Sequence, residues 1–223
     1  MKKWVTVNEP WVIAGGGHGW GEHAPGETGQ MYRAGHTLIL AHAAAYRAYD
    51  TKYRKTQGGL IGITLSCGHA EGTEPHIPNN WNAAWHKLEF ELGWFADPIF
   101  ATGDYPTYMK EKLGNSSEPE NFLPKFSRNQ ITNNVGSDFF GLNHYSTYLF
   151  RPCEDCLEGF QDTFCNEWPG SGSEWLRSVP WGFRKLLRHI KRKYNDPMIY
   201  VTENGISEKD SDVTLQDNFR LGF

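Results

Sequence analysis

Two glutamates end two apolar segments that lie far apart in this sequence. The segment WVTVNEPW (4–11) alternates like a strand and stops at Glu9, directly before a proline, and MIYVTENG (198–205) stops at Glu203. Two carboxyl groups brought together from such places can perform acid–base and nucleophilic chemistry on one bond. Cleavage of a glycosidic bond needs such a pair, because one group protonates the leaving oxygen while the other attacks the anomeric carbon or activates water.

Each glutamate also has a purely structural interpretation. Glu203 could open a turn at the following Asn-Gly pair, and Glu9 could be an acidic residue at the start of a helix that Pro10 begins. The sequence contains no phosphate-binding loop, no G-x-S-x-G elbow and no H-E-x-x-H helix. The glycine-rich segment GGGHG (15–19) lacks the spacing of a dinucleotide-binding loop, and we interpret it as a flexible loop beside the site.

Four segments have the apolar character of strands, and they alternate with segments of helical periodicity. The predicted strands are 4–8, 57–66, 137–150 and 198–203, and the predicted helices are 28–53, 80–101, 105–113 and 180–194. The last helix is clearly amphipathic, and Asp196-Pro197 ends it. His42 lies inside an alanine-rich helical segment, and we interpret it as a structural histidine.

Strands that alternate with helices predict an α/β protein with a parallel sheet. Because the predicted strands are apolar along their length, we expect them to be covered on both faces. In such folds the functional side chains gather at the carboxyl ends of the strands. Glu9, Asn143, Tyr145 and Glu203 all occupy such positions, so the sequence predicts that they lie close together.

The size and charge of the chain exclude some classes of function. The chain has 223 residues, a net charge of −4 and a pI of about 6.1. This length is enough for one domain with a core. The acidic balance argues against nucleic acid as a partner, and no apolar run reaches the roughly 20 residues of a membrane span. We interpret the basic run KRK (191–193) as a solvated helix end.

Three of the four cysteines, Cys153, Cys156 and Cys165, crowd one segment that is rich in glycine and acidic residues. A lone C-x-x-C is a weak signal, because no second pair lies at the spacing of metal ligands. A loop disulfide is favoured, and free thiols and a metal site stay open. The cysteine cluster and the glycosylation sequon NSS (115–117) favour a secreted or extracellular location, with a cytosolic location as the alternative.

Two short motifs resemble the signatures of a known family. TVNEP (6–10) and VTENG (201–205) are similar to the two signatures of glycoside hydrolase family 1, which holds retaining β-glucosidases and lactase-like enzymes. Further stretches along nearly the whole chain agree with the family: HAPGE, GLIGITL, DPIFATGDYP, DFFGLNHY and VPWGFRKLL. Together and in this order, the motifs are highly specific.

The resemblance implies a fold and a reaction. Residues 1–223 are expected to form part of a (β/α)8 TIM barrel, roughly strands 4 to 7 with their helices, with strands 1 to 3 and strand 8 missing. We therefore expect the outer strands to expose apolar faces. The implied reaction is hydrolysis of a β-glucoside or β-galactoside by a two-carboxylate double displacement. No metal and no organic cofactor is implied.

The resemblance also assigns roles residue by residue. Glu9 matches the general acid/base, and Glu203 matches the nucleophile that forms the glycosyl-enzyme. The implied substrate-binding residues are Asn8, Asn143, Tyr145 and Trp175. Asn8 is expected to contact the sugar 2-hydroxyl, and Asn143 is a neighbouring site amide. Tyr145 is expected to donate a hydrogen bond to the nucleophile, and the aromatic ring of Trp175 to lie under the leaving group.

A non-catalytic chain is the alternative interpretation. A truncated remnant or a binding isoform would keep both motifs without turnover, because the segments that grip the sugar in this family are missing from the match. The sequence leaves the oligomeric state open.

Overall fold

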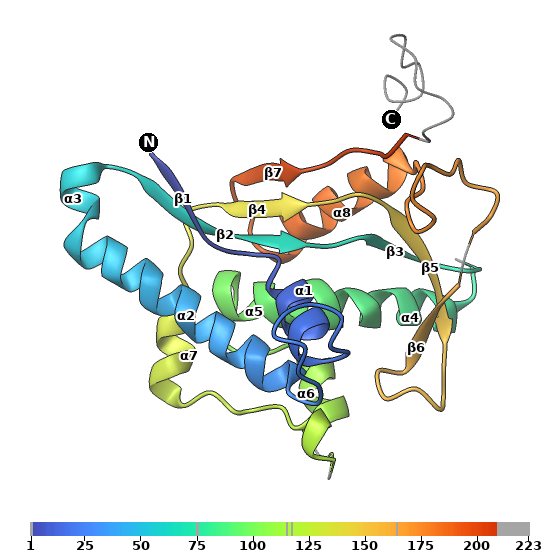
Figure 1. Ribbon diagram of the computed structural model, residues 1–223, viewed down its shortest axis with the longest axis horizontal. Coiled ribbons are helices and arrows are strands. Elements are labelled where there is room, and N and C mark those ends of the chain that lie inside the picture. Colours follow the sequence, from blue (N-terminus) through green and yellow to red (C-terminus); the bar gives the residue numbers. More distant parts are fainter. Residues whose placement is uncertain (1, 75, 115, 117, 164, 209–223) are drawn as a thin grey trace.

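A computed structural model of the chain describes residues 2–74, 76–114, 116, 118–163 and 165–208. Its centre is a sheet of four parallel strands in the order β1 (Lys3–Asn8), β2 (Leu60–Ser66), β4 (Phe140–Asn143) and β7 (Ile199–Glu203). Each of the predicted strands contributes to this sheet, and helices connect them (Figure 1). The chain therefore has the α/β fold that the alternation of strands and helices predicts.

The predicted helices are all present and supply much of the core. They are α2 (Met31–Lys52), α4 (Pro78–Leu88), α5 (Trp94–Phe100), α6 (Thr107–Leu113) and α8 (Pro180–Lys193). A π-helical turn, η2 (Glu89–Gly93), joins α4 to α5, so the predicted helix 80–101 is continuous. Phe100 of α5 stacks on Phe140 of β4 with ring centroids 4.6 Å apart, and Leu186 of α8 is fully buried. α2 and α5 thus pack onto the sheet, and α8 adds Leu186 to the core that Phe140 and Leu142 of β4 share.

Several short helical elements have no counterpart in the prediction. They are α1 (Pro10–Val12), η1 (Ile13–Gly17), α3 (Arg54–Gln57), η3 (Pro119–Asn121) and α7 (Arg128–Asn134). The start of α7 is stabilised by a capping box, in which Ser127 and Gln130 satisfy each other's backbone amides. Elements this short show too few turns for a periodic signal.

The segment 137–150, predicted as one strand, is two strands in different sheets. β4 ends at Asn143, and β5 (Thr147–Pro152) lies between β3 (His69–Gly72) and β6 (Phe160–Thr163) in a second sheet. The prediction was wrong because apolar residues continue on both sides of the break at 144–146, and hydrophobicity alone does not identify the sheet. The sequence also did not predict β3 or β6, and β6 lies within the segment that holds the cysteines.

Residues 15–19, predicted as a flexible loop, belong mostly to a buried helical turn. η1 follows α1 directly, and Gly15, Gly16 and Gly17 are all buried. A Cβ atom on Gly15 would lie 2.2 Å from the Trp20 ring, and one on Gly16 would lie 2.8 Å from His23. The glycines therefore allow two rings to approach the backbone closely, which explains them without flexibility.

The central strands are covered, whereas the outer strands are not. β2 and β4 are almost entirely buried, as predicted. Trp4 and Val5 of β1 are 47% and 46% exposed, and Val201 of β7 is 47% exposed. Full coverage was therefore a wrong prediction for β1 and β7, the two edge strands, because the apolar character of a strand does not show whether its faces are covered. The expectation of exposed apolar faces on the outer strands is confirmed.

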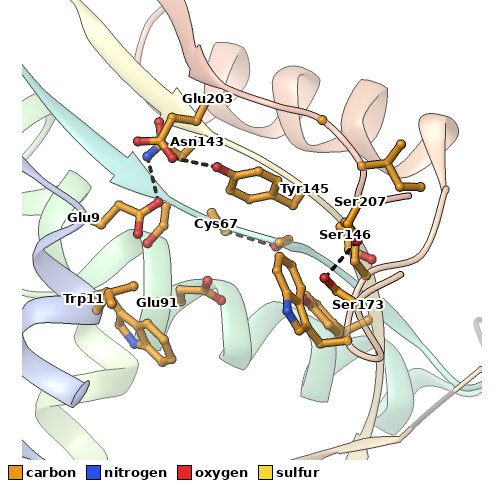
Figure 2. A pocket seen from close by; sticks show the side chains of 18 residues that line it. Glu9, Trp11, Cys67, Glu91, Asn143, Tyr145, Ser146, Ser173, Glu203 and Ser207 are labelled. Atoms are coloured by element: carbon orange, nitrogen blue, oxygen red, sulfur yellow. Dashed lines mark hydrogen bonds between the residues drawn. The ribbon is translucent and has the colours of Figure 1, made fainter. Parts of the chain in front are cut away.

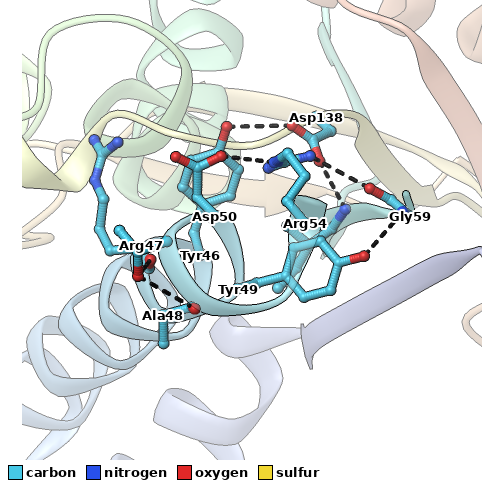
Figure 3. Close-up of polar contacts among 10 residues, drawn as sticks. Tyr46, Arg47, Ala48, Tyr49, Asp50, Arg54, Gly59 and Asp138 are labelled. Atoms are coloured by element: carbon cyan, nitrogen blue, oxygen red, sulfur yellow. Dashed lines mark hydrogen bonds and ion pairs between the residues drawn. The ribbon is translucent and has the colours of Figure 1, made fainter. Parts of the chain in front are cut away.

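Asp138 ties the beginnings of β2 and β4 to the end of α2 (Figure 3). Its carboxylate accepts hydrogen bonds from the Ile61 amide at 2.9 Å and from Arg54 Nη1 at 2.6 Å. The Tyr46 hydroxyl donates a third at 3.2 Å. Hydrogen bonding to Asp138 raises the pKa of Arg54, so the guanidinium group stays positively charged. This network holds the end of the sheet that lies away from Glu9 and Glu203.

His42 is the structural histidine that its position predicts. It is fully buried, its Nε2 lies 2.8 Å from the Gly136 carbonyl oxygen, and its Nδ1 lies 2.6 Å from Thr6 Oγ1. Both ring nitrogens are therefore satisfied in the core.

The cysteine segment contains a disulfide between Cys153 and Cys156, as favoured from the sequence. Cys165 and the buried Cys67 are free thiols. Asn115 and Ser117 of the sequon lie outside the described residues. Within the described part of the chain, no helix has the length and apolar character that would let it cross a membrane.

Candidate active site

A cavity of about 690 Å³ opens at the carboxyl ends of the parallel strands (Figure 2). Glu9, which follows β1, and Glu203, which ends β7, both line this cavity, and Asn143 at the end of β4 lies between them in the sheet order. The structure thus brings together side chains that are up to 194 residues apart. Their positions at strand ends were the signal that predicted this.

The backbone of Glu9 is left-handed, with φ 51° and ψ 59°. This conformation is rare for a residue with a side chain, and a residue before proline is normally extended. Glu9 occupies the cap position of α1, but its carboxylate makes no capping hydrogen bond. Oε1 accepts instead from Asn143 Nδ2 at 2.7 Å. The carboxylate is therefore directed at the cavity, and Glu9 is not simply a helix-start acid.

The pairing register shifts in both strands that carry the glutamates. In β1 the shift lies between Val5 and Asn8. In β7, Val201 pairs with Leu142 and Glu203 pairs with Asn143, so that Thr202 is an extra residue. An extra residue of this kind bends a strand and redirects the side chains beside it. Both shifts come directly before the glutamates along the chain, so they change the direction in which the two carboxylates leave the sheet.

Tyr145 donates a hydrogen bond to Glu203 Oε2 at 2.6 Å. This hydrogen bond, together with burial and the charges of Glu203 and Glu9, raises the pKa of the Tyr145 phenol to about 12. The phenol therefore remains protonated at neutral pH and stays a donor. The Glu203 carbonyl oxygen also accepts from the His144 amide at 3.0 Å. Backbone and side chain together hold Glu203 in place.

The buried amide of Asn143 connects both sides of the site. Its Nδ2 donates to Glu9 Oε1 and, at 3.1 Å, to Asn8 Oδ1. Its Oδ1 accepts from Thr202 Oγ1 at 2.6 Å. One side chain on β4 therefore joins the end of β1 to the end of β7.

Trp175 and Asn8 approach the cavity differently. Trp175 lines it from a loop and is 49% exposed, and its ring lies edge-on to Tyr145 with centroids 5.8 Å apart. Asn8 is exposed and is not a lining residue, and it reaches the site through Asn143. Apart from Asn8, the predicted site residues all line the cavity.

A third carboxylate, Glu91 of η2, lines the cavity without having been predicted (Figure 2). Its partner is Lys87, one helical turn earlier, whose ammonium lies 5.0 Å from the centroid of the Trp11 ring in the same cavity wall. Burial opposes the charge of Lys87, but Glu91 outweighs it and the pKa of Lys87 is raised. The i,i+4 spacing of this pair was its one sequence signal, and that spacing does not reveal a cavity.

Cys67 also lines the cavity, but its thiol is not activated. It is buried, and burial raises the pKa of the thiol well above its usual range. Among the described residues, no group of three or more His, Cys, Asp or Glu side chains is placed to hold a metal ion.

Parallel strands joined by helices, with functional side chains at their carboxyl ends, are the arrangement of part of a TIM barrel. The family model described as Glycosyl hydrolase family 1 matches residues 1–223. The chain belongs to this family, as its two motifs predict.

Known proteins are similar to this chain along nearly its whole length. Human lactase/phlorizin hydrolase is 40% identical over 238 residues, which cover 99% of this chain and 12% of the relative. β-Glucosidase 4 of Oryza sativa subsp. japonica is 39% identical over 253 residues, which cover 100% of this chain and 49% of the relative. A solved rice β-glucosidase mutant in a covalent complex with Glc has a TM-score of 0.90, at 32% identity over 100% of this chain and 52% of that one. The chain spans about half the length, or less, of these relatives.

Proposed function

We propose that this chain supplies the catalytic pair of a retaining β-glycosidase that cleaves O-linked β-glucosides or β-galactosides. The observation that supports the proposal is that Glu9 and Glu203 line one cavity, where each accepts a hydrogen bond from a different donor. A double displacement requires two carboxyl groups whose surroundings differ, because one must donate a proton while the other stays ionised.

In the first step Glu203 is the nucleophile. Its carboxylate attacks the anomeric carbon and forms a glycosyl ester, while the bond between that carbon and the leaving oxygen breaks. Glu9 is protonated at this stage and gives its proton to the leaving oxygen. Tyr145 holds the attacking carboxylate by its hydrogen bond to Oε2.

In the second step water replaces the leaving group. Glu9, now a carboxylate, takes a proton from water as the water oxygen attacks the anomeric carbon. The ester bond to Glu203 breaks, and both carboxyl groups return to their starting states. If this route retains the configuration of the anomeric carbon, the two carboxyl groups should lie about 5–5.5 Å apart. A crystal structure with a bound sugar would measure this distance.

The other site residues bind and orient the sugar in this proposal. Asn8 contacts the sugar 2-hydroxyl, Asn143 positions Asn8 and Glu9 through its amide, and Trp175 stacks under the leaving group. The exposed ring of Trp175 at the cavity wall supports its role, since apolar sugar faces pack on aromatic rings. The relatives named lactase and β-glucosidase, and the rice structure with covalent Glc, support glucosides and galactosides as the substrate class.

A non-catalytic binding chain is the second candidate. It is favoured by the exposed apolar residues of the strands at both edges of the sheet. Such a chain would keep the cavity but lack the contacts that position a sugar, and misplacement by 1 Å can cost roughly a hundredfold in rate.

Covalent trapping distinguishes the two candidates. The probe is a dinitrophenyl β-glucoside with fluorine in place of the hydroxyl next to the anomeric carbon, which slows hydrolysis of the ester. In the longest polypeptide that contains these residues, we expect mass spectrometry to find the sugar on Glu203 and no adduct in Glu203→Gln. Glu9→Gln should still react, because this leaving group needs no proton.

Glu74→Gln is the matched control, since this carboxylate is 58% exposed and does not line the cavity. It should be labelled like the unsubstituted protein. An adduct on a different carboxylate would contradict the assignment of Glu203. A folded protein without any adduct would favour the non-catalytic candidate.

A further inference from the structure

A second pair of hollows lies between α4 and α8, away from the candidate active site. The larger, of about 620 Å³, is lined by Trp85 of α4 and by a row of α8 side chains: Lys185, Arg188, His189, Arg192 and Lys193. The smaller, of about 240 Å³, shares Trp85, Lys185 and His189 with it and adds Trp81. We call the two together the α4–α8 groove. It shares no lining residue with the cavity at Glu9 and Glu203.

Most charges of the groove are already paired, but two are not. Lys185 contacts Glu71 at 2.5 Å, and Lys193 contacts Asp97 at 2.9 Å. Arg188 and Arg192 are exposed and form no ion pair with the residues that the structure describes. They lie one helical turn apart on the same face of α8. Among the described residues no acidic side chain lines the larger hollow, and Glu71, which lines the smaller one, is paired with Lys185. The groove thus presents two guanidinium groups that lack counter-charges.

The opposite wall of the groove is aromatic. Trp85 and Trp81 come from successive turns of α4 and are 37% and 57% exposed. Tryptophan faces accept the apolar face of a sugar ring, and guanidinium groups bind sulfate or carboxylate through two parallel hydrogen bonds.

We propose that the α4–α8 groove binds an anionic oligosaccharide, whose acidic groups pair with Arg188 and Arg192 and whose sugar ring packs on Trp85. Two hollows between helices, with an aromatic wall, suit a chain of sugars better than the flat surface of a membrane. This binding does not depend on the proposed hydrolysis, because the groove and the catalytic cavity are separate.

The test is titration calorimetry of the full chain with a sulfated hexasaccharide derived from heparin. We expect binding that weakens at least about tenfold in the double variant Arg188→Gln, Arg192→Gln, since a charge-assisted hydrogen bond contributes on the order of a factor of ten or more. The matched control is Arg184→Gln, Lys191→Gln, which removes two charges from the same helix outside the groove. This control should change the affinity less than about twofold. Trp85→Leu should also weaken binding, and desulfated hexasaccharide should bind poorly.

Several results would overturn the proposal. Equal losses in the two double variants would mean that any positive charge on α8 serves and that the groove is not a site. Equal affinity for an oligodeoxynucleotide or for phosphatidylserine vesicles would assign the surface to nucleic acid or membrane. Absence of binding to the hexasaccharide at low salt, by a chain that circular dichroism shows to be folded, would also refute it.

Discussion

The Tyr145 hydroxyl lies 2.6 Å from Glu203 Oε2, although the two residues are 58 positions apart in the sequence. Tyr145 reaches Glu203 because the chain leaves the first sheet after Asn143 and enters the second sheet at Thr147. The connection between β4 and β5 therefore places a phenol beside the end of β7. Trp175 packs edge-on against the same ring and holds it from a second side.

Removal of this hydroxyl should reduce turnover more than stability. Tyr145→Phe keeps the ring but loses a hydrogen bond to a charged group, which contributes about 1.5–3 kcal/mol. In the longest polypeptide that contains the chain, kcat for a nitrophenyl β-glucoside should fall roughly 10- to 100-fold. Tyr53→Phe, at an exposed tyrosine, is the control. Unchanged kcat in Tyr145→Phe would show that the reaction does not use this contact.

Loss of the Asn143 amide should lower both stability and activity. Asn143→Ala removes three hydrogen bonds of a fully buried amide, one of them to a carboxylate, and the free energy of unfolding should fall by about 1–3 kcal/mol. It also frees the Glu9 carboxylate from its donor, so turnover should be lost as well. Urea denaturation measures the first effect, with Asn133→Ala on the exposed face of α7 as the control. A cost equal to that of the control would argue against the bridge.

The two aspartates that contact Arg54 should differ in their contribution to stability. The Asp138 side chain is 15% exposed and also accepts from the Ile61 amide, whereas Asp50 is 46% exposed. Asp138→Asn should destabilise by about 2–3 kcal/mol, because it weakens a partly buried network. Asp50→Asn should cost less than about 1 kcal/mol, as exposed pairs do. Thermal and urea unfolding of both variants would check the ranking.

Acid should destabilise the fold through its buried histidines. Burial lowers the pKa of His42 and of His144 to about 4, from an ordinary value of 6.5. Between those pH values the unfolded chain binds more protons than the folded chain, so stability falls as the pH falls from about 6.5 to about 4. Each histidine contributes at most about 3 kcal/mol of this loss.

Urea midpoints between pH 7 and pH 4.5 would measure this effect. His42→Gln should flatten the pH dependence, whatever its effect on stability at pH 7. His76→Gln, at a side chain that is 79% exposed, should leave the slope unchanged. An equal slope in all three proteins would contradict the assignment to buried histidines.

Local patterns were enough to predict the first sheet, its long helices and the two glutamates. Each of these strands is a short apolar run, and α2 and α8 are long enough to show helical periodicity. Because parallel strands end at one edge, a carboxylate after β1 and another at the end of β7 had to face the same region. The predicted functional residues that depend on this rule, such as Asn143, lie at the cavity.

Features that depend on tertiary contacts were not predictable in this way. The hydrophobicity of the sequence does not reveal the break between β4 and β5, because both strands are apolar. Glu91 reaches the cavity because a π-helical turn interrupts the α4–α5 segment, and this turn has no sequence signature. The buried glycines of η1 look like loop residues until Trp20 and His23 are placed against them.

The left-handed backbone of Glu9 has a consequence for how this position evolves. Glycine would adopt the same φ and ψ without the conformational free-energy cost of roughly 1–2 kcal/mol that a side chain adds in this region. Selection for thermal stability alone would therefore favour glycine at position 9, while selection for turnover keeps the glutamate. Glu9→Gly should accordingly melt at a higher temperature than Glu9→Ala, although both lack the carboxylate. The left-handed conformation of an acidic residue at this position is therefore a cost in stability that the proposed acid–base role of Glu9 would explain.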